Sequence, residues 1–255
     1  MKLEPGIARR FCLGLLLLWA AFPSAGLCDD SFSIPTGCQQ LVLTLTDDWN
    51  LSNGVLQRFE RSNDEWHPVG QPWPVRLGKN GLAWGRGLHP ADLDGLVKKE
   101  GDGRAPCGVF AIGEAYGYDP EIQKNPNLGY TQVTEQDLWV EDSSSPYYNK
   151  HLRLPGRGPQ NDWEKRQQMR MDDPAHRLKL FIGHNTGPGT ERGAGSAIFF
   201  HIWRENGAKP TTGCTAMEEQ RLRELIAWVD PAAKPLYVLL PKPVYQQLVK
   251  QWKLP

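Results

Sequence analysis

The sequence predicts a mostly β fold with a few helices, an α+β domain rather than a helical bundle. Short apolar segments recur along the 255 residues, each bounded by turn-forming residues. The chain also contains 26 glycines and 21 prolines, which suit short strands joined by many turns. There is no internal repeat, low-complexity tract or linker, so we expect a single domain with a substantial core.

The first 28 residues are expected to be a secretory signal. Basic residues precede an apolar run over residues 11–22, and small residues follow that run. The run is too short to span a membrane comfortably. We therefore expect residues 29–255 to form the domain of an exported protein, in the periplasm or cell envelope, with no stable membrane insertion after the signal is removed.

Strands are expected throughout the first half of the domain. Residues 41–46 alternate apolar side chains with threonine, as a half-buried strand does. Two strand segments are expected within 55–70, around a turn at 62–65, and two more within 73–85, around a turn at 78–81. A further short strand is expected at 109–112.

The second half mixes strands with helices. A strand beginning near residue 138 runs into a polar loop, and 162–171 is expected to be helical. The apolar segments 178–185 and 195–203 predict buried strands. The clearest helix is expected over 214–230, followed by a strand at 236–241 and a C-terminal helix at 244–252.

Charge and cysteine usage narrow the function classes. The chain has 29 basic and 29 acidic residues and no long basic run, which argues against a nucleic-acid partner. Removal of the signal leaves Cys38, Cys107 and Cys214; outside the cytoplasm we expect a Cys38–Cys107 disulfide and a free, reactive Cys214. The histidines lack the spacing of metal ligands, and no Cys-x-x-Cys is present, so neither metal nor cofactor is expected.

Cys214 lies in the segment "HIWRENGAKPTTGCTAM", directly before an expected helix start. Thr215 and Glu218 have the spacing of a capping box, and apolar residues then repeat at helical intervals. Unpaired N–H groups and the helix dipole at that position would favour the thiolate, which is the nucleophilic form. Gly213 permits a sharp turn with accessible N–H groups, a candidate oxyanion hole.

The residues alone leave other readings open. Cys214 could be a buried small hydrophobe or half of a disulfide. His201, in the apolar segment "AIFFHIW", could be a hydrogen-bonded core residue. Only if the two side chains meet in space could His201 act as the base for Cys214.

Several segments together resemble a known family. "GDGRAPCGVFAIGEAYGY", "EDSSSPYYNKHL", "LFIGHN", "GAGSAIFFHIW" and "PTTGCTAM" occur in this order. Residues 38–242 thereby resemble the L,D-transpeptidase catalytic domain (YkuD-like) family. The resemblance implies a β-sandwich with a catalytic cleft at one end. It also implies action on peptidoglycan stem peptides: a cysteine attacks the carbonyl of the third residue and expels the terminal D-Ala, and an amine or water then resolves the acyl-enzyme.

By this resemblance, Cys214 corresponds to the nucleophile, His201 to the base and Gly213 to the glycine before the nucleophile. The better-known family pattern is Ser-His-Gly-Cys-Ile-Arg, whereas this chain has Thr-Thr-Gly-Cys-Thr-Ala. Its second histidine is replaced by Thr212 and its arginine by Ala216. We expect Arg204 or His184 to substitute for that arginine.

The expected substrate-binding residues are Thr211, Thr212, His184, Asn185, Arg204, Trp203 and Tyr148. A strand-end turn would equally explain His184 and Asn185, and core packing would explain Tyr148. The expected function is that of an exported, monomeric cysteine acyltransferase, an L,D-transpeptidase of peptidoglycan stem peptides. The alternatives are an L,D-carboxypeptidase or hydrolase of peptidoglycan-linked peptides, and a non-catalytic muropeptide-binding module.

Overall fold

The computed structural model describes residue 1 and residues 32–255. The chain divides into two units, Met1–Asp30 and Ser31–Pro255, and the helices and strands of the described residues all lie in the second unit. The expected signal at residues 1–28 therefore lies, apart from Met1, outside the described residues. No helix among residues 32–255 has the length and apolar character needed to cross a membrane.

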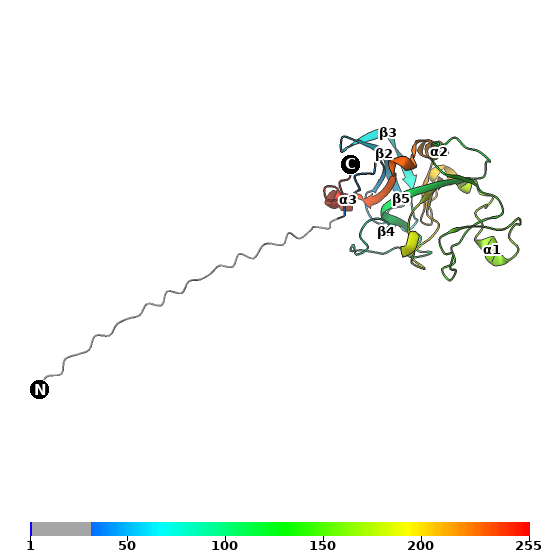
Figure 1. The fold of residues 1–255 in the computed structure, drawn as a ribbon, viewed down its shortest axis with the longest axis horizontal. Helices are drawn as coiled ribbons and strands as arrows, with labels where there is room; N and C mark the ends of the chain where they lie inside the picture. Colours follow the sequence, from blue (N-terminus) through cyan, green and yellow to red (C-terminus); the bar gives the residue numbers. More distant parts are fainter. Residues whose placement is uncertain (2–31) are drawn as a thin grey trace. The chain divides into compact units, whose positions relative to one another are not determined.

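Strands dominate the domain, as the sequence predicts (Figure 1). In chain order they are β1 (Gln40–Thr46), β2 (Asn53–Ser62), β3 (Glu65–Arg76), β4 (Leu82–Trp84), β5 (Ala105–Gly117), β6 (Tyr130–Gln132), β7 (Asp137–Trp139), β8 (His151–Arg153), β9 (Leu178–Ile182), β10 (Phe199–Ile202), β11 (Thr215–Met217) and β12 (Leu236–Pro241). The mostly β prediction with a few helices is confirmed.

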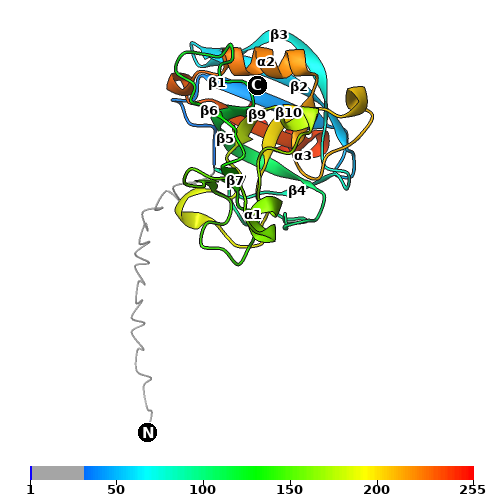
Figure 2. The same ribbon diagram turned by 90° about the vertical axis from the view of Figure 1, so that its right-hand side faces the viewer.

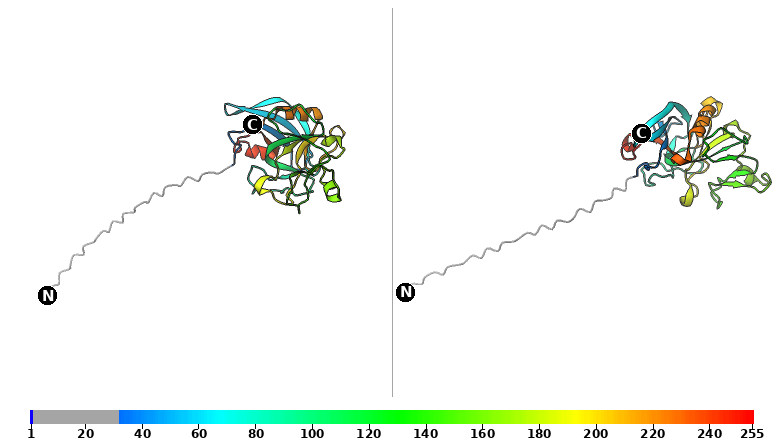
Figure 3. Two further views of the ribbon diagram at one scale, coloured as in Figure 1. Left: turned by 45° about the vertical axis from the view of Figure 1, so that its right-hand side comes forward. Right: turned by 45° about the horizontal axis from the view of Figure 1, so that its top comes forward.

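The helices are short. They are α1 (Asp162–Arg166), α2 (Glu219–Trp228) and α3 (Lys242–Leu248), with 3-10 turns η1 (Pro174–His176), η2 (Gly187–Gly189), η3 (Glu205–Gly207) and η4 (Pro231–Ala233). Figures 1 and 3 show α3 and α1 at opposite ends of the described domain. Helix α2 packs against β9 and β10, and Figure 2 shows it along one side of the strands.

The main sheet closes on itself. Its strands follow the order β12-β1-β2-β3-β11-β10-β9-β5, and β12 also pairs with β5, which joins the two ends of this path. Short strands β4 and β6 add to β5, and β7 pairs with β8 separately. Closure removes the exposed edges that an open sheet of this size would present.

Alternation along β10 divides its side chains between two apolar clusters. Phe200 and Ile202 point into the main core, where the Phe200 ring lies 4.6 Å from that of Tyr237. Phe199 belongs to a second, smaller cluster on the opposite face. His201 shares that face with Phe199, because side chains two residues apart in a strand lie on the same side.

The β2–β3 hairpin agrees with the turn expected at 62–65. Asn63 and Asp64, between the two strands, have φ of 50° and 62°. Positive φ at both central residues is what a two-residue turn of the I′ type requires. The other expected pair, within 73–85, is not a hairpin, because β4 pairs in parallel with β5 rather than with β3.

The expected helix over 214–230 is wrong in its first part. Thr215–Met217 forms β11, which pairs in parallel with β10, and α2 begins only at Glu219. The capping box does not form: Glu218 caps α2 without a side-chain hydrogen bond, and the Thr215 hydroxyl bonds to the Tyr237 hydroxyl at 2.9 Å. Pairing with β10 gives this segment a neighbour that local sequence patterns do not reveal.

The expected Cys38–Cys107 disulfide is also wrong, since both thiols are free and buried. Cys38 leads into β1, Cys107 lies in β5, and β12 lies between those two strands. Two strand spacings amount to about 10 Å, beyond the roughly 7 Å over which Cα atoms can be bridged. The Cys38 thiol instead donates to the Gln40 carbonyl at 3.2 Å.

Free thiols at these positions predict a simple labelling result. We expect iodoacetamide, applied to the denatured full-length chain without a reductant, to alkylate the peptides that contain Cys38 and Cys107. Peptide mass mapping would measure the modification, with a pre-reduced sample as control. A disulfide-linked Cys38–Cys107 peptide pair, released only by reductant, would contradict the structure.

Candidate active site

The pairing of β10 with β11 brings Cys214 and His201 to one face of the sheet. The two strands run parallel, with Phe200 opposite Thr215 and His201 opposite Ala216. Cys214 therefore arrives beside Phe199, whose N–H donates to the Cys214 Sγ at 3.4 Å. From strand dimensions, the Cα atoms of His201 and Cys214 are about 8 Å apart on a diagonal. Their side chains share a face, and no hydrogen bond joins the Cys214 sulfur to the His201 ring in this structure.

Strand β9 extends this face on the other side of β10. It is antiparallel to β10, with Lys179 opposite His201 and Phe181 opposite Phe199. Two rows of side chains therefore cross the three strands: Lys179–His201–Ala216 and Phe181–Phe199–Cys214. The candidate base and nucleophile occupy neighbouring rows.

Aromatic side chains from outside these strands cover the second row. The Trp139 ring lies 4.7 Å from the Phe181 ring and 4.8 Å from the Phe199 ring, centroid to centroid. Tyr116 packs edge-on against both Trp139 and Phe199. This cluster excludes water from one wall of the site, with Cys214 packed at its margin.

Cys214 opens into a cavity of about 150 Å³, which we call the nucleophile pocket. Its lining residues are Lys98, Glu100, Gly101, Glu141, Ser196, Ala197, Ile198, Thr212, Gly213 and Cys214. The Cys214 thiol donates to the Ala197 carbonyl at 3.4 Å. Charged groups of both signs thus surround a half-buried sulfur.

Burial raises the pKa of Cys214 to about 11, although the Phe199 N–H and the charges of Lys179 and Lys98 act in the opposite direction. The resting sulfur is therefore a thiol. The expected activation by a helix N-terminus does not occur, because β11 separates Cys214 from α2. Activation has to come from a base and from nearby charge.

His201 is held as a neutral imidazole with one free nitrogen. The side chain is 3% exposed, and burial lowers its pKa to about 4. Its Nδ1 lies 2.8 Å from the Ile202 carbonyl, which can only accept, so Nδ1 carries the proton. Nε2 is left with a lone pair, which is the form a general base requires.

A second histidine, His176, supports His201. Their rings stack at 5.1 Å between centroids and 23° between planes. The Arg204 guanidinium forms an ion pair with Asp173 and donates to His176 Nε2 at 3.0 Å. Burial, with the positive charges of Lys179 and Arg204 nearby, lowers the pKa of His176 to about 3, so both rings of the stacked pair are neutral.

Thr211 fixes the loop that carries the nucleophile. Its buried Oγ1 accepts from the Gly213 N–H at 3.1 Å and donates to the Cys214 carbonyl at 2.7 Å. The Gly213 N–H is thus occupied, contrary to the expected oxyanion role, whereas the Cys214 N–H has no acceptor among residues 32–255. A Cβ at Gly213 would lie 3.1 Å from the Arg104 carbonyl oxygen. The position is therefore too crowded for a larger residue, which accounts for a glycine here.

Two expected substrate-binding residues are buried and hydrogen-bonded to the backbone. His184 is 0% exposed, with Nδ1 accepting from the Arg86 N–H and Nε2 donating to the Ala194 carbonyl at 3.0 Å. The buried Asn185 amide donates to the carbonyls of Glu191 and Gly195. Both side chains bond to the backbone of the 186–197 loop. Asn185 also borders a separate cavity of about 160 Å³, whereas His184 has both ring nitrogens occupied and no exposed surface with which to replace the family arginine.

The remaining expected residues lie at different distances from the nucleophile. Thr212 is exposed and lines the nucleophile pocket. The buried Tyr148 does not line the pocket itself, and its hydroxyl bonds to the carboxylate of Glu100, which does. Trp203 is half-buried and packs beside Gly207, and Arg204 is engaged by Asp173 and His176 behind His201.

Sequence reasoning missed several groups of the site. The signal for Lys179 is a charge inside an otherwise apolar strand, "LKLFI", and it could have been found. Glu141 follows β7 in a polar loop, where a glutamate is common, so no sequence pattern marks it as a site residue. Desolvation in the cleft and the charge of Glu100 raise the pKa of Glu141 to about 7. The spacing of His176 in the sequence bears only on metal binding and does not reveal its stacking on His201.

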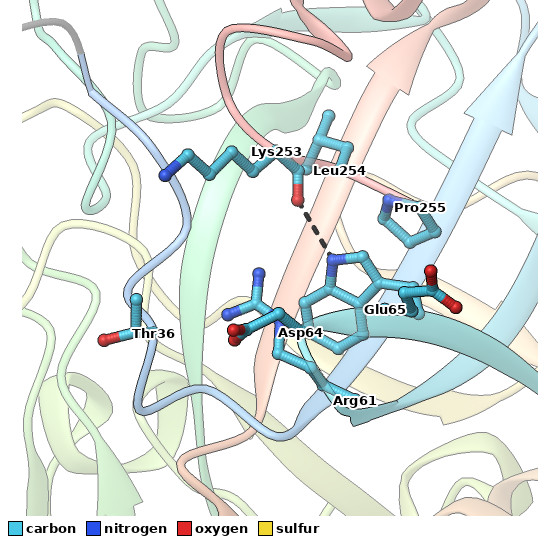
Figure 4. Close-up of a pocket in the computed structure, with 8 residues that line it drawn as sticks. Thr36, Arg61, Asp64, Glu65, Lys253, Leu254 and Pro255 are labelled. Atoms are coloured by element: carbon cyan, nitrogen blue, oxygen red, sulfur yellow. Dashed lines mark hydrogen bonds between the residues drawn. The ribbon is translucent and has the colours of Figure 1, made fainter.

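A larger cavity, of about 540 Å³, lies away from these residues (Figure 4). It is lined by Thr36, Arg61, Asp64, Glu65, Trp66, Lys253, Leu254 and Pro255. The Trp66 indole N–H crosses it to the Lys253 carbonyl at 3.0 Å. None of its lining residues is a cysteine or histidine, so it offers no nucleophile and base. Within residues 32–255 no group of three or more His, Cys, Asp or Glu is arranged to hold a metal.

The Thr211 bonds predict a measurable effect of removing one hydroxyl. We expect Thr211→Val, which keeps the shape, to lower the free energy of unfolding by about 1–3 kcal/mol, because the Gly213 N–H and the Cys214 carbonyl lose their partner. Urea unfolding would measure the loss. Thr211→Ser, which retains the hydroxyl, should recover most of it, and equal stability of the two variants would contradict these bonds.

Comparison with known proteins identifies a family for this chain. Residues 50–238 match the family model YkuD, described as the L,D-transpeptidase catalytic domain. No curated protein matches the sequence. A solved structure, the helical cell shape determining protein Pgp2 from Campylobacter jejuni, is similar at 14% identity with a TM-score of 0.37. That similarity covers 80% of this chain and 48% of the other, so this chain spans about half of that protein's length.

Members of the matched family are L,D-transpeptidases, enzymes of peptidoglycan. The family model covers well over half of the chain, including both Cys214 and His201. This chain therefore belongs to the YkuD family of L,D-transpeptidase catalytic domains.

Proposed function

We propose that this protein is an exported cysteine acyltransferase, an L,D-transpeptidase that acts on peptidoglycan stem peptides. Membership of the family supports the substrate class. The observation that carries the proposal is the pairing of β10 with β11, which puts a thiol and a neutral imidazole with an unprotonated Nε2 on one face beside a pocket. That combination suits nucleophilic acyl transfer.

In the acylation step, the Cys214 Sγ attacks the carbonyl carbon of the third residue of the stem peptide. His201 Nε2 takes the thiol proton as the S–C bond forms, and the Cys214 N–H donates to the developing oxyanion. The C–N bond to the terminal D-Ala then breaks, and the imidazolium returns its proton to the leaving amine. The product is a thioester with a neutral His201.

In the second step, an acceptor attacks the thioester carbonyl. His201 Nε2 takes a proton from the attacking amine or water, the C–S bond breaks, and the proton passes to the departing sulfur. An amine acceptor from a second stem peptide gives a cross-link, and water gives a trimmed peptide. The same two side chains therefore serve both outcomes, and access of the acceptor to the cleft selects between them.

The two reacting groups are both neutral at rest. Burial raises the pKa of the thiol to about 11 and lowers that of the imidazole to about 4. A stable thiolate–imidazolium pair is therefore disfavoured, and the proton moves as the sulfur attacks. This is general-base catalysis rather than reaction through a preformed ion pair.

We also propose that the protein is exported to the compartment that holds its substrate. Peptidoglycan lies outside the cytoplasm, and residues 1–28 have the basic start, apolar run and small residues of a secretory signal.

Mass spectrometry after incubation with a disaccharide-tetrapeptide tests the proposal. We expect an adduct on the peptide that contains Cys214, release of D-Ala, and no adduct in Cys214→Ser. We expect His201→Gln to acylate at least about 100-fold more slowly, because the base is gone. Accumulation of dimer or of tripeptide identifies the acceptor. Binding of the muropeptide to the wild type without any covalent adduct would contradict the proposal.

A further inference from the structure

Lys179 is a buried ammonium inside an apolar strand. Its side chain is 3% exposed, its Nζ donates to the Met169 carbonyl at 3.2 Å, and the Phe199 ring centroid lies 5.5 Å away. No carboxylate of residues 32–255 lies within ion-pair distance of Nζ. Lys98, which is similarly buried, differs in having Asp102 at 2.6 Å.

An unpaired ammonium in a dry environment is costly. Lysine is almost never fully buried unless it is paired, and an apolar residue would pack in its place without the cost of desolvation. One carbonyl and one aromatic face use only part of what three N–H donors offer. The position of Lys179 is therefore explained better by negative charge that forms nearby, and Cys214 and Glu141 are the two groups whose negative forms act on it.

The site contains a group that would carry such a charge. Lys179 lies opposite His201 in the β9–β10 register, and its ammonium sits over Phe199, whose N–H donates to the Cys214 sulfur. Met169, which accepts from Lys179, and Cys214 belong to the same cluster around Phe199. On the far side of His201, Ala216 contributes no charge.

We propose that Lys179 is the positioning charge of the nucleophile: its ammonium stabilises negative charge on the Cys214 sulfur when the thiol loses its proton. The effect on thiol chemistry holds for any electrophile. Its consequence for peptide transfer rests on the proposed function. Lys179 acts through the sulfur and is not assigned any contact with the substrate.

The charge state of Lys179 at neutral pH fits this role. Burial lowers its pKa to about 8, while the negative forms of Cys214 and Glu141 oppose that shift. The ammonium is therefore mostly charged at pH 7 and loses its charge above pH 8.

The other titratable and charged groups around the sulfur behave differently over this range. They are His176, His201, Glu141, Glu100, Lys98, Tyr148 and Arg204. Both histidines have pKa values of about 3 and 4, so they are already neutral at pH 7. The pKa of Glu141 is about 7, so Glu141 is ionised above pH 7. Lys98 is held by Asp102, and burial beside Glu100 raises the pKa of Tyr148. Between about pH 8 and 10 we therefore attribute a change in the field at Cys214 to Lys179.

The test measures the rate at which iodoacetamide alkylates Cys214 in the full-length chain between pH 6 and 11, by peptide mass spectrometry. In the wild type we expect the rate to rise by less than tenfold per pH unit above pH 8, because Lys179 loses its charge as the thiol ionises. In Lys179→Met we expect a uniform tenfold rise per unit and, at pH 7, a rate about tenfold lower, which corresponds to a shift of about one unit.

Two further lysine variants serve as comparisons. Lys179→Arg keeps a positive charge and should retain most of the rate at pH 7. Lys209→Met makes the same change at an exposed lysine and should match the wild type throughout. Urea unfolding should show Lys179→Met to be no less stable than the wild type, because a buried unpaired charge has been removed. A structural role alone would lower stability and leave the shape of the pH profile unchanged.

A wild-type rate and profile in Lys179→Met would overturn the proposal. If Lys179→Met does not fold, the pH profile of the wild-type alkylation rate tests the proposal by itself. A uniform tenfold rise in that rate per pH unit up to pH 10 would overturn the proposal. Failure of the proposed function is seen separately, as absence of an acyl-enzyme with the tetrapeptide, and does not alter the alkylation result.

Discussion

The parallel pairing of β10 with β11 is the constraint on which the site depends. It sets Cys214 beside Phe199 and His201 beside Ala216, so that nucleophile and base share a face without any sequence motif linking them. The antiparallel pairing with β9 then adds Lys179 to the same row as His201. Three short strands thereby assemble the three groups. A shift of one residue in either register would turn a key side chain into the main core.

The site combines dryness with a few fixed polar contacts. Aromatic packing around Trp139 and Phe199 removes water, which keeps both the thiol and the imidazole neutral at rest. The Ile202 carbonyl fixes the tautomer of His201, and Thr211 fixes the backbone at Cys214. In a low-dielectric site of this kind, the ammonium of Lys179 acts on the sulfur more strongly than an exposed charge would.

The sequence was informative where the signal is local. The apolar strands, the turn at Asn63–Asp64 and the order of the family segments predicted the fold class, and the placement of Cys214 and His201 on one face followed the resemblance. The errors concern long-range pairing. Residues 215–217 have a good local helix pattern but gain hydrogen bonds from β10, and Cys38 and Cys107 are separated by β12. The contacts of Lys179 and His176 with the site likewise depend on which strands are neighbours.

Nitrogen-15 NMR of the His201 ring at pH 7 measures most directly whether the resting pair is neutral. A neutral His201 should give one protonated nitrogen, Nδ1, and one unprotonated nitrogen, Nε2, with no change when Cys214 is replaced by serine. Two protonated nitrogens in the wild type, with one proton lost in Cys214→Ser, would mean that a thiolate–imidazolium pair exists before any substrate arrives and would contradict the general-base mechanism.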